Sequence, residues 1–139
     1  GCSSKDSHLI LPRVSLDERT LNKIDFYPFK STTAKLAMTA HILYSKIDSK
    51  NVSTFSKKII KKIIRKKIGF NGILMTDDIS MKALKYDLIS NAKKALEAGC
   101  NLVLYCAGNI EDNFKLIKSI PYIDKFTSKK TSEIYKILR

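Results

Sequence analysis

The chain has 139 residues, of which 44% are hydrophobic, and this content supports a packed core and argues against intrinsic disorder. Its 26 Lys and Arg residues outnumber the 13 Asp and Glu residues, which gives a formal net charge of +13. The basic residues are spread along the chain, which favours solvated faces over a nucleic-acid or anionic-membrane partner. No run of about 18 apolar residues occurs, so we expect no transmembrane helix.

The cysteine pattern excludes a disulfide framework and a cysteine metal site. Cys2, Cys100 and Cys106 are odd in number and have no metal-ligand spacing. Cys100 and Cys106 flank a predicted strand, where a free cysteine behaves as a small apolar residue. This usage indicates a reducing, cytoplasmic compartment. The chain begins with Gly1 rather than Met, so we expect its natural N-terminus to lie upstream.

The first half of the chain predicts two short helical pieces, a strand and a long helix. The helical pieces cover residues 15–24 and 26–33, and the near-continuous apolar strand covers residues 35–42. The long helix follows a loop, since Ile and Phe residues recur at the 3.6-residue period from Phe55. Ser53 or Thr54 can cap its start, and Gly69 can end it.

The second half continues the alternation of strand and helix. The pattern predicts a strand over residues 72–76, a helical region over 80–98, a strand over 101–106, a helix from 109 and a last helix over 129–138. Asp87 can cap the second part of the first helical region, and Gly99 can end it. Buried strands alternating with amphipathic helices indicate parallel βαβ units. Three strands are too few for a closed barrel, so the chain looks incomplete.

The most informative segment is residues 69–81, GFNGILMTDDISM. Its apolar run predicts a buried parallel strand that ends at two carboxylates, Asp77 and Asp78. The carboxyl ends of such strands are where α/β folds place their chemistry. An alternative is helix capping, which Asp78 or Ser80 can provide. Capping does not account for Asp77.

Five blocks of the sequence, in order, resemble glycoside hydrolase family 3 in its bacterial β-N-acetylhexosaminidase branch. Besides GFNGILMTDDISM, they are DSHLILP at residues 6–12, DFYPFK at 25–30, MTAH at 38–41 and AGCN at 98–101. The resemblance covers most of residues 1–110. It implies a partial (β/α)₈ TIM barrel within one catalytic domain, with residues 111–139 as C-terminal helices. The chain would be roughly the second, C-terminal half of the barrel, and the missing N-terminal half would carry the remaining sugar-binding groups.

By this resemblance, Asp77 is the nucleophile of a retaining hydrolase of terminal β-N-acetylglucosaminides, and a muropeptide from peptidoglycan recycling is the implied substrate. His8 is the implied acid/base and Asp6 its partner. The chemistry is reasonable, because an imidazole exchanges protons near neutrality and a carboxylate can fix its tautomer. His41 is an alternative candidate for the acid/base, but we expect it to be a buried, hydrogen-bonded histidine. No metal or cofactor is implied.

Two alternatives remain open at this level. The chain can be a truncated, non-catalytic remnant, since a half-barrel exposes sheet edges. It can also be a binding module, with the basic face of residues 53–67 contacting nucleic acid or anionic lipid. No aromatic residues are interleaved with those lysines, which argues against the second alternative. We therefore expect neither a nucleic-acid nor a membrane partner.

Overall fold

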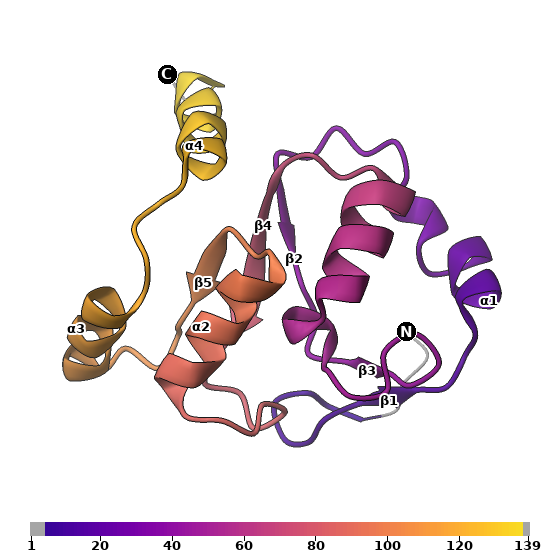
Figure 1. Ribbon diagram of the computed structural model, residues 1–139, viewed down its shortest axis with the longest axis horizontal. Coiled ribbons are helices and arrows are strands. Elements are labelled where there is room, and N and C mark those ends of the chain that lie inside the picture. Colours follow the sequence, from indigo (N-terminus) through magenta and orange to yellow (C-terminus); the bar gives the residue numbers. More distant parts are fainter. Residues whose placement is uncertain (1–4, 138–139) are drawn as a thin grey trace.

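The computed structural model describes residues 5–137, so Cys2, the start of the chain at Gly1 and the end of the last predicted helix at Leu138 lie outside it. It is an α/β fold with parallel strands, as predicted (Figure 1). A three-stranded sheet has the order β2-β4-β5 and a two-stranded sheet pairs β1 with β3. The strands are β1 (Arg13–Val14), β2 (Leu36–Met38), β3 (Leu43–Tyr44), β4 (Ile73–Asp78) and β5 (Leu102–Leu104).

Within residues 5–137, seven helical elements connect or follow the strands. They are α1 (Glu18–Lys23), η1 (Tyr27–Phe29), η2 (Ser53–Phe55), η3 (Ile59–Ile68), α2 (Leu88–Ala98), α3 (Ile110–Ser119) and α4 (Lys125–Ile137). Asp87 and Asn109 cap α2 and α3 by accepting backbone N–H bonds, and Gly99 ends α2 in the left-handed conformation. These three signals are local, and the sequence identified all of them.

Helices cover one face of the larger sheet. Leu74 of β4 packs with Ile60 of η3 and Ala95 of α2 in one apolar cluster. On the other face, Leu36 and Met38 of β2 remain 48% and 51% exposed, although Ile73 of β4, the partner of Leu36, is buried. Side chains alternate between faces along a strand, so one side of this sheet is packed by helices and the other is partly exposed along β2. This is the layer arrangement expected of a barrel segment, with outer helices and an inner face.

The helix η3 is the element whose form differs most from its prediction. It is wound as a π-helix and ends at Gly69, which has φ +82°. Neither Ser53 nor Thr54 caps it, and the hydroxyl of Ser56 instead accepts the N–H of Ile59 at 3.1 Å. Ile59 and Ile63 pack toward α1, while Ile60 packs toward β4. The helix therefore divides its wide apolar face between two clusters.

The structure corrects the bounds of three further predicted elements. The strand expected over 35–42 ends at Met38, and residues 43–44 pair separately with β1, whose strand we did not predict. The helical region expected over 80–98 begins only at Leu88. The last helix begins at Lys125, where Asp124 accepts the Thr127 N–H at 2.6 Å, rather than at 129.

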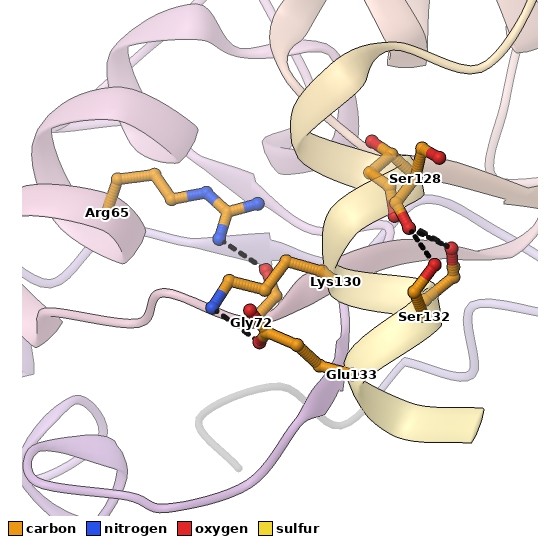
Figure 2. A network of polar contacts seen from close by, with 8 residues as sticks. Arg65, Gly72, Ser128, Lys130, Ser132 and Glu133 are labelled. Atoms are coloured by element: carbon orange, nitrogen blue, oxygen red, sulfur yellow. Dashed lines mark hydrogen bonds and ion pairs between the residues drawn. The ribbon is translucent and has the colours of Figure 1, made fainter. Parts of the chain in front are cut away.

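Arg65 joins the amino-terminal ends of β4 and β5 to α4. Its guanidinium donates to the carbonyl of Gly72 at 2.7 Å and to Oδ1 of Asn101 at 2.7 Å. Nδ2 of Asn101 in turn donates to Thr127 of α4 at 2.9 Å. Figure 2 shows Arg65 reaching Gly72 beside α4, on which Lys130 pairs with Glu133. The end of the sheet opposite Asp77 is thus closed by structural bonds.

Two chemical features of the described residues bear on function. Cys100 is buried and burial raises the pKa of its thiol to about 12, whereas Cys106 is exposed rather than packed. A thiol with so high a pKa is unreactive near neutrality. Among residues 5–137, no helix has the length and apolarity needed to cross a membrane.

Candidate active site

Asp77 and Asp78 form the carboxyl end of β4, and both are partly exposed. The pairing of β4 with β5 is irregular here, because Met75 pairs with Leu102 and Asp78 pairs with Leu104. Three residues of β4 therefore match two of β5, and side chains do not alternate simply over this part of the strand. The strand thus places both carboxylates at the carboxyl end of the sheet.

The two carboxylates are bonded very differently. Asp78 accepts hydrogen bonds from the amide and hydroxyl of Ser80, at 3.0 and 2.7 Å, and from the Cys106 amide at 3.2 Å. Partial burial acts to raise the pKa of Asp78, but these bonds outweigh it and the pKa is lowered. Asp78 thus anchors the turn that follows β4. This turn also explains why no helix starts at Ser80.

Asp77 has a free oxygen by comparison. Within residues 5–137, the only bond to its carboxylate is from the Asp78 amide, which donates to Oδ1 at 2.8 Å. That bond fixes the orientation of the group and leaves Oδ2 without a donor in the described part of the chain. A carboxylate oxygen held in this way on a strand can attack an electrophile placed beside it.

Asp6 and His8 form a paired loop at the surface. Oδ1 of Asp6 accepts from the backbone N–H of His8 at 2.9 Å and lies 2.8 Å from its Nδ1. Because a carboxylate only accepts, Nδ1 carries the proton and Nε2 is left for another partner. The pKa of His8 is raised, first by this hydrogen bond and the charge of Asp6, and then by smaller contributions from Asp77 and Asp78. The loop and the end of β4 are thus close enough for their charges to interact.

His41 is fully buried and has a structural role. Its Nε2 lies 3.0 Å from the backbone carbonyl of Asp78, and its Nδ1 lies 2.8 Å from Oγ1 of Thr54. The carbonyl must accept, so Nε2 carries the proton and the Thr54 hydroxyl donates to Nδ1. Thr39 lies 3.1 Å from the same hydroxyl. His41 therefore holds the backbone beside Asp77 and cannot itself reach a ligand.

The sequence indicated Asp77, Asp6, His8 and the buried character of His41, but it missed Thr54. We interpreted Thr54 as a helix cap, because Ser and Thr favour that position. No spacing rule connects a threonine at 54 to a histidine at 41 through the carbonyl of residue 78. The hydroxyl is completely buried beside a ring nitrogen, and only the folded chain reveals this.

Titration of His41 should make the protein less stable in mild acid. Burial lowers the pKa of His41 below its ordinary value of 6.5, so the unfolded chain gains a proton more readily than the folded one. The stabilisation is complete above pH 6.5 and is lost as the pH falls through the folded pKa. In thermal melts between pH 7 and 5, the melting temperature of His41→Gln should fall less than that of the wild type.

His8→Gln provides a control of opposite sign. The pKa of His8 is raised, so its stabilising contribution is present below pH 6.5 and is lost as the pH rises through the folded pKa. Removing this group should make the fall in mild acid slightly steeper, by a small amount because His8 is exposed. Parallel curves for His41→Gln and the wild type would contradict a neutral, buried His41.

Comparison with known proteins shows which protein family this chain resembles. The model of the glycosyl hydrolase family 3 N terminal domain matches residues 1–132. A beta-hexosaminidase of Haemophilus influenzae strain PittEE is 39% identical over 131 residues, which are 84% of this chain and 36% of the relative. A beta-hexosaminidase of Shewanella frigidimarina is 34% identical over 122 residues, or 81% of this chain and 35% of the relative. The chain thus spans about a third of the length of these curated relatives.

Solved structures agree with this assignment. NagZ from Neisseria gonorrhoeae, in complex with N-trifluoroacetyl-D-glucosamine, has a TM-score of 0.77 and 27% identity, covering 91% of this chain and 37% of that one. A family 3 beta-N-acetylglucosaminidase from Paenibacillus has a TM-score of 0.82 at 23% identity, covering 96% and 28%, and supports the fold alone. These neighbours are barrel domains, and this chain is a partial piece of one. The matched model also corrects the expectation of a C-terminal half, because it describes the family's N-terminal domain.

Proposed function

Because the chain belongs to glycosyl hydrolase family 3, we propose that it forms part of the catalytic barrel of a retaining β-N-acetylhexosaminidase. It would be one part of a single catalytic domain, with residues 111–139 as closing helices. The substrate would be a terminal, non-reducing β-N-acetylglucosaminide, such as a muropeptide fragment released in peptidoglycan recycling. The enzyme would act in the cytoplasm.

The observation that carries this proposal is the position of Asp77. It lies at the carboxyl end of β4, is partly exposed and has one oxygen without a donor in the described residues. A nucleophilic carboxylate needs all three properties. In the first step, an oxygen of Asp77 would attack the anomeric carbon while the bond to the leaving oxygen breaks. Water would then release the sugar from the covalent ester.

His8 would supply the proton for the leaving oxygen and later accept one from the attacking water. Its pairing with Asp6 through Nδ1 leaves Nε2 for this exchange. The hydrogen bond to Asp6 and its charge, with smaller contributions from Asp77 and Asp78, raise the pKa of His8, so the ring is more often protonated near neutrality than a free imidazole. A glycosidase whose proton donor is an imidazole is thus chemically consistent with this loop.

The remaining strands of the barrel would supply the groups that grip the sugar. The chain should therefore be inactive alone and active when joined in frame to the rest of its barrel, here called the joined protein. Hydrolysis of a chromogenic β-N-acetylglucosaminide by the joined protein tests the proposal. No turnover by a folded joined protein would favour the alternative of a non-catalytic remnant. Turnover by the 139-residue chain alone would contradict its dependence on the missing strands.

Removing the charge of Asp6 should shift the pH dependence of turnover. In Asp6→Asn, the pKa of His8 should fall toward its ordinary value, because its largest raising influence is lost. The basic limb of kcat/KM against pH should then move to lower pH in the joined protein, together with a lower maximal rate. Asp87→Asn, which affects only the cap of α2, is the matched control and should leave the limb unmoved. If the basic limb of Asp6→Asn does not shift, Asp6 does not influence the group whose titration sets that limb.

A further inference from the structure

A hollow of about 540 Å³ lies away from Asp77, on the helix-covered side of the chain. Its walls are formed within residues 48–58 on one side and residues 83–98 on the other, with part of β1 and β3 at one end. We call it the outer groove. Asp77, His8 and His41 do not line it. Its volume is in the range of small-molecule sites.

Positive side chains are concentrated in the outer groove. Six of its eighteen lining residues are Lys or Arg, against 26 of 139 in the whole chain. These six are Arg13, Lys50, Lys57, Lys58, Lys85 and Lys94. They come from both walls, so an anion in the groove would be approached from two sides.

Two acidic residues among the described lining of the groove, Asp48 and Glu97, offset part of this charge. Asp48 accepts bonds from the amides of Lys50 and Asn51 and from the Ser56 hydroxyl at 2.6 Å, so its carboxylate is held by its own loop. Partial burial acts to raise the pKa of Asp48, but these bonds outweigh it and the pKa is lowered, which favours the charged form. Glu97 is exposed to solvent. Six basic against two acidic side chains still leave the described lining with an excess of positive charge.

Aromatic and apolar groups line the same groove. The rings of Phe55 and Tyr86 lie 6.2 Å apart, one on each wall, and Tyr86 is 54% exposed. The ammonium of Lys94 lies 4.5 Å from the centre of the Tyr86 ring. A planar ring can stack on such aromatic side chains while its charged group meets the lysines.

We propose that the outer groove binds a small organic phosphate, meaning a planar ring that carries a phosphate group. A phosphate dianion can engage ammonium groups from both walls, such as Lys57 and Lys85, whereas a carboxylate offers a single charge. The planar ring of the ligand would stack on the aromatic side chains of Phe55 and Tyr86. This inference is independent of the proposed glycosidase, because it concerns a different surface and needs no turnover.

Calorimetric titration of the joined protein at about 0.1 M salt, where long-range attraction between exposed charges is screened, tests the proposal. The probes are adenosine monophosphate, adenosine and inorganic phosphate. Adenosine monophosphate should bind at least about fivefold more tightly than either of the others, because only it uses both the lysines and the rings. No heat with adenosine monophosphate, or equal affinities for all three, would overturn the inference.

Matched variants locate the binding. Lys57→Gln and Lys85→Gln should each weaken binding of adenosine monophosphate about three- to fivefold, as expected for a partly solvated ion pair. Tyr86→Leu should weaken adenosine monophosphate and leave phosphate unchanged. Lys61→Gln and Lys66→Gln change exposed lysines of η3 outside the groove and should have no effect. Equal weakening by the groove and control variants would mean non-specific attraction to a basic protein and would refute the site.

Discussion

Asp77→Asn should lower kcat of the joined protein by about a thousandfold or more, the scale seen when a catalytic nucleophile or its partner is removed. An amide oxygen carries no charge and attacks the anomeric carbon poorly, whereas the shape of the side chain is preserved. The bond from the Asp78 amide to Oδ1 can persist in the variant. Stability should therefore change little while turnover is lost. Steady-state rates on a chromogenic β-N-acetylglucosaminide, with thermal melts alongside, measure both quantities.

Asp78→Asn is the control for this experiment, because it removes the neighbouring charge and keeps the same strand. The two carboxylate oxygens of Asp78 accept bonds from Ser80 and Cys106. Replacing this carboxylate with a side-chain amide should therefore loosen the turn and lower the melting temperature. Its effect on kcat should stay within about tenfold, since the nucleophile remains. If Asp78→Asn lost the larger share of turnover, the roles of the two carboxylates would have to be exchanged. Full turnover in Asp77→Asn would remove Asp77 from the mechanism.

A second version of the experiment distinguishes attack by Asp77 from a purely electrostatic role. In Asp77→Gly, added azide can occupy the vacated space and attack the anomeric carbon in place of the carboxylate. The product should be a glycosyl azide with inverted configuration, because one displacement replaces two. Recovery of turnover without such a product would indicate that the carboxylate only stabilises charge.

The sequence was most successful where structure depends on nearby residues. The caps at Asp87 and Asn109 and the stop at Gly99 are each decided within one helical turn. The apolar run before Asp77 predicted a buried strand because a parallel strand packed by helices needs that pattern. The alternation of such strands with amphipathic helices was enough to predict parallel βαβ units.

The sequence failed where distant residues decide the outcome. Residues 39–42 continue the apolar run of β2, but the His41 ring turns into the core to reach Thr54 and the Asp78 carbonyl, and the strand ends. Residues 80–86 have a helical pattern, but Asp78, which accepts bonds from Ser80, also accepts the amide of the distant Cys106, and these bonds hold a turn there. In both cases a polar bond formed on folding overrode a local preference. The same bonds also shape the candidate site.

Gly72→Ala should destabilise the protein by about 3 kcal/mol, the upper end of the typical cost of forcing an extra methyl group into a packed site. A Cβ at this position would lie 2.5 Å from the Lys35 carbonyl oxygen and 2.7 Å from Cζ of Phe70. The Lys35 carbonyl accepts the Ile73 N–H at 2.9 Å, the bond that begins the pairing of β2 with β4. Backbone atoms cannot move aside as a flexible side chain can, so the two strands must separate. Chemical denaturation followed by circular dichroism measures the loss.

Gly69→Ala is the matched control, because both glycines belong to the same segment before Asp77. Gly69 has φ +82° but no atom within 4 Å of an added Cβ, so its substitution should cost only about 1 kcal/mol through backbone strain. The expected order, Gly72→Ala much worse than Gly69→Ala, would be reversed if close strand contact were unimportant. Displacing β2 would also move His41, which holds the carbonyl of Asp78 beside Asp77. Gly72→Ala should therefore reduce turnover of the folded joined protein as well, whereas Gly69→Ala should not.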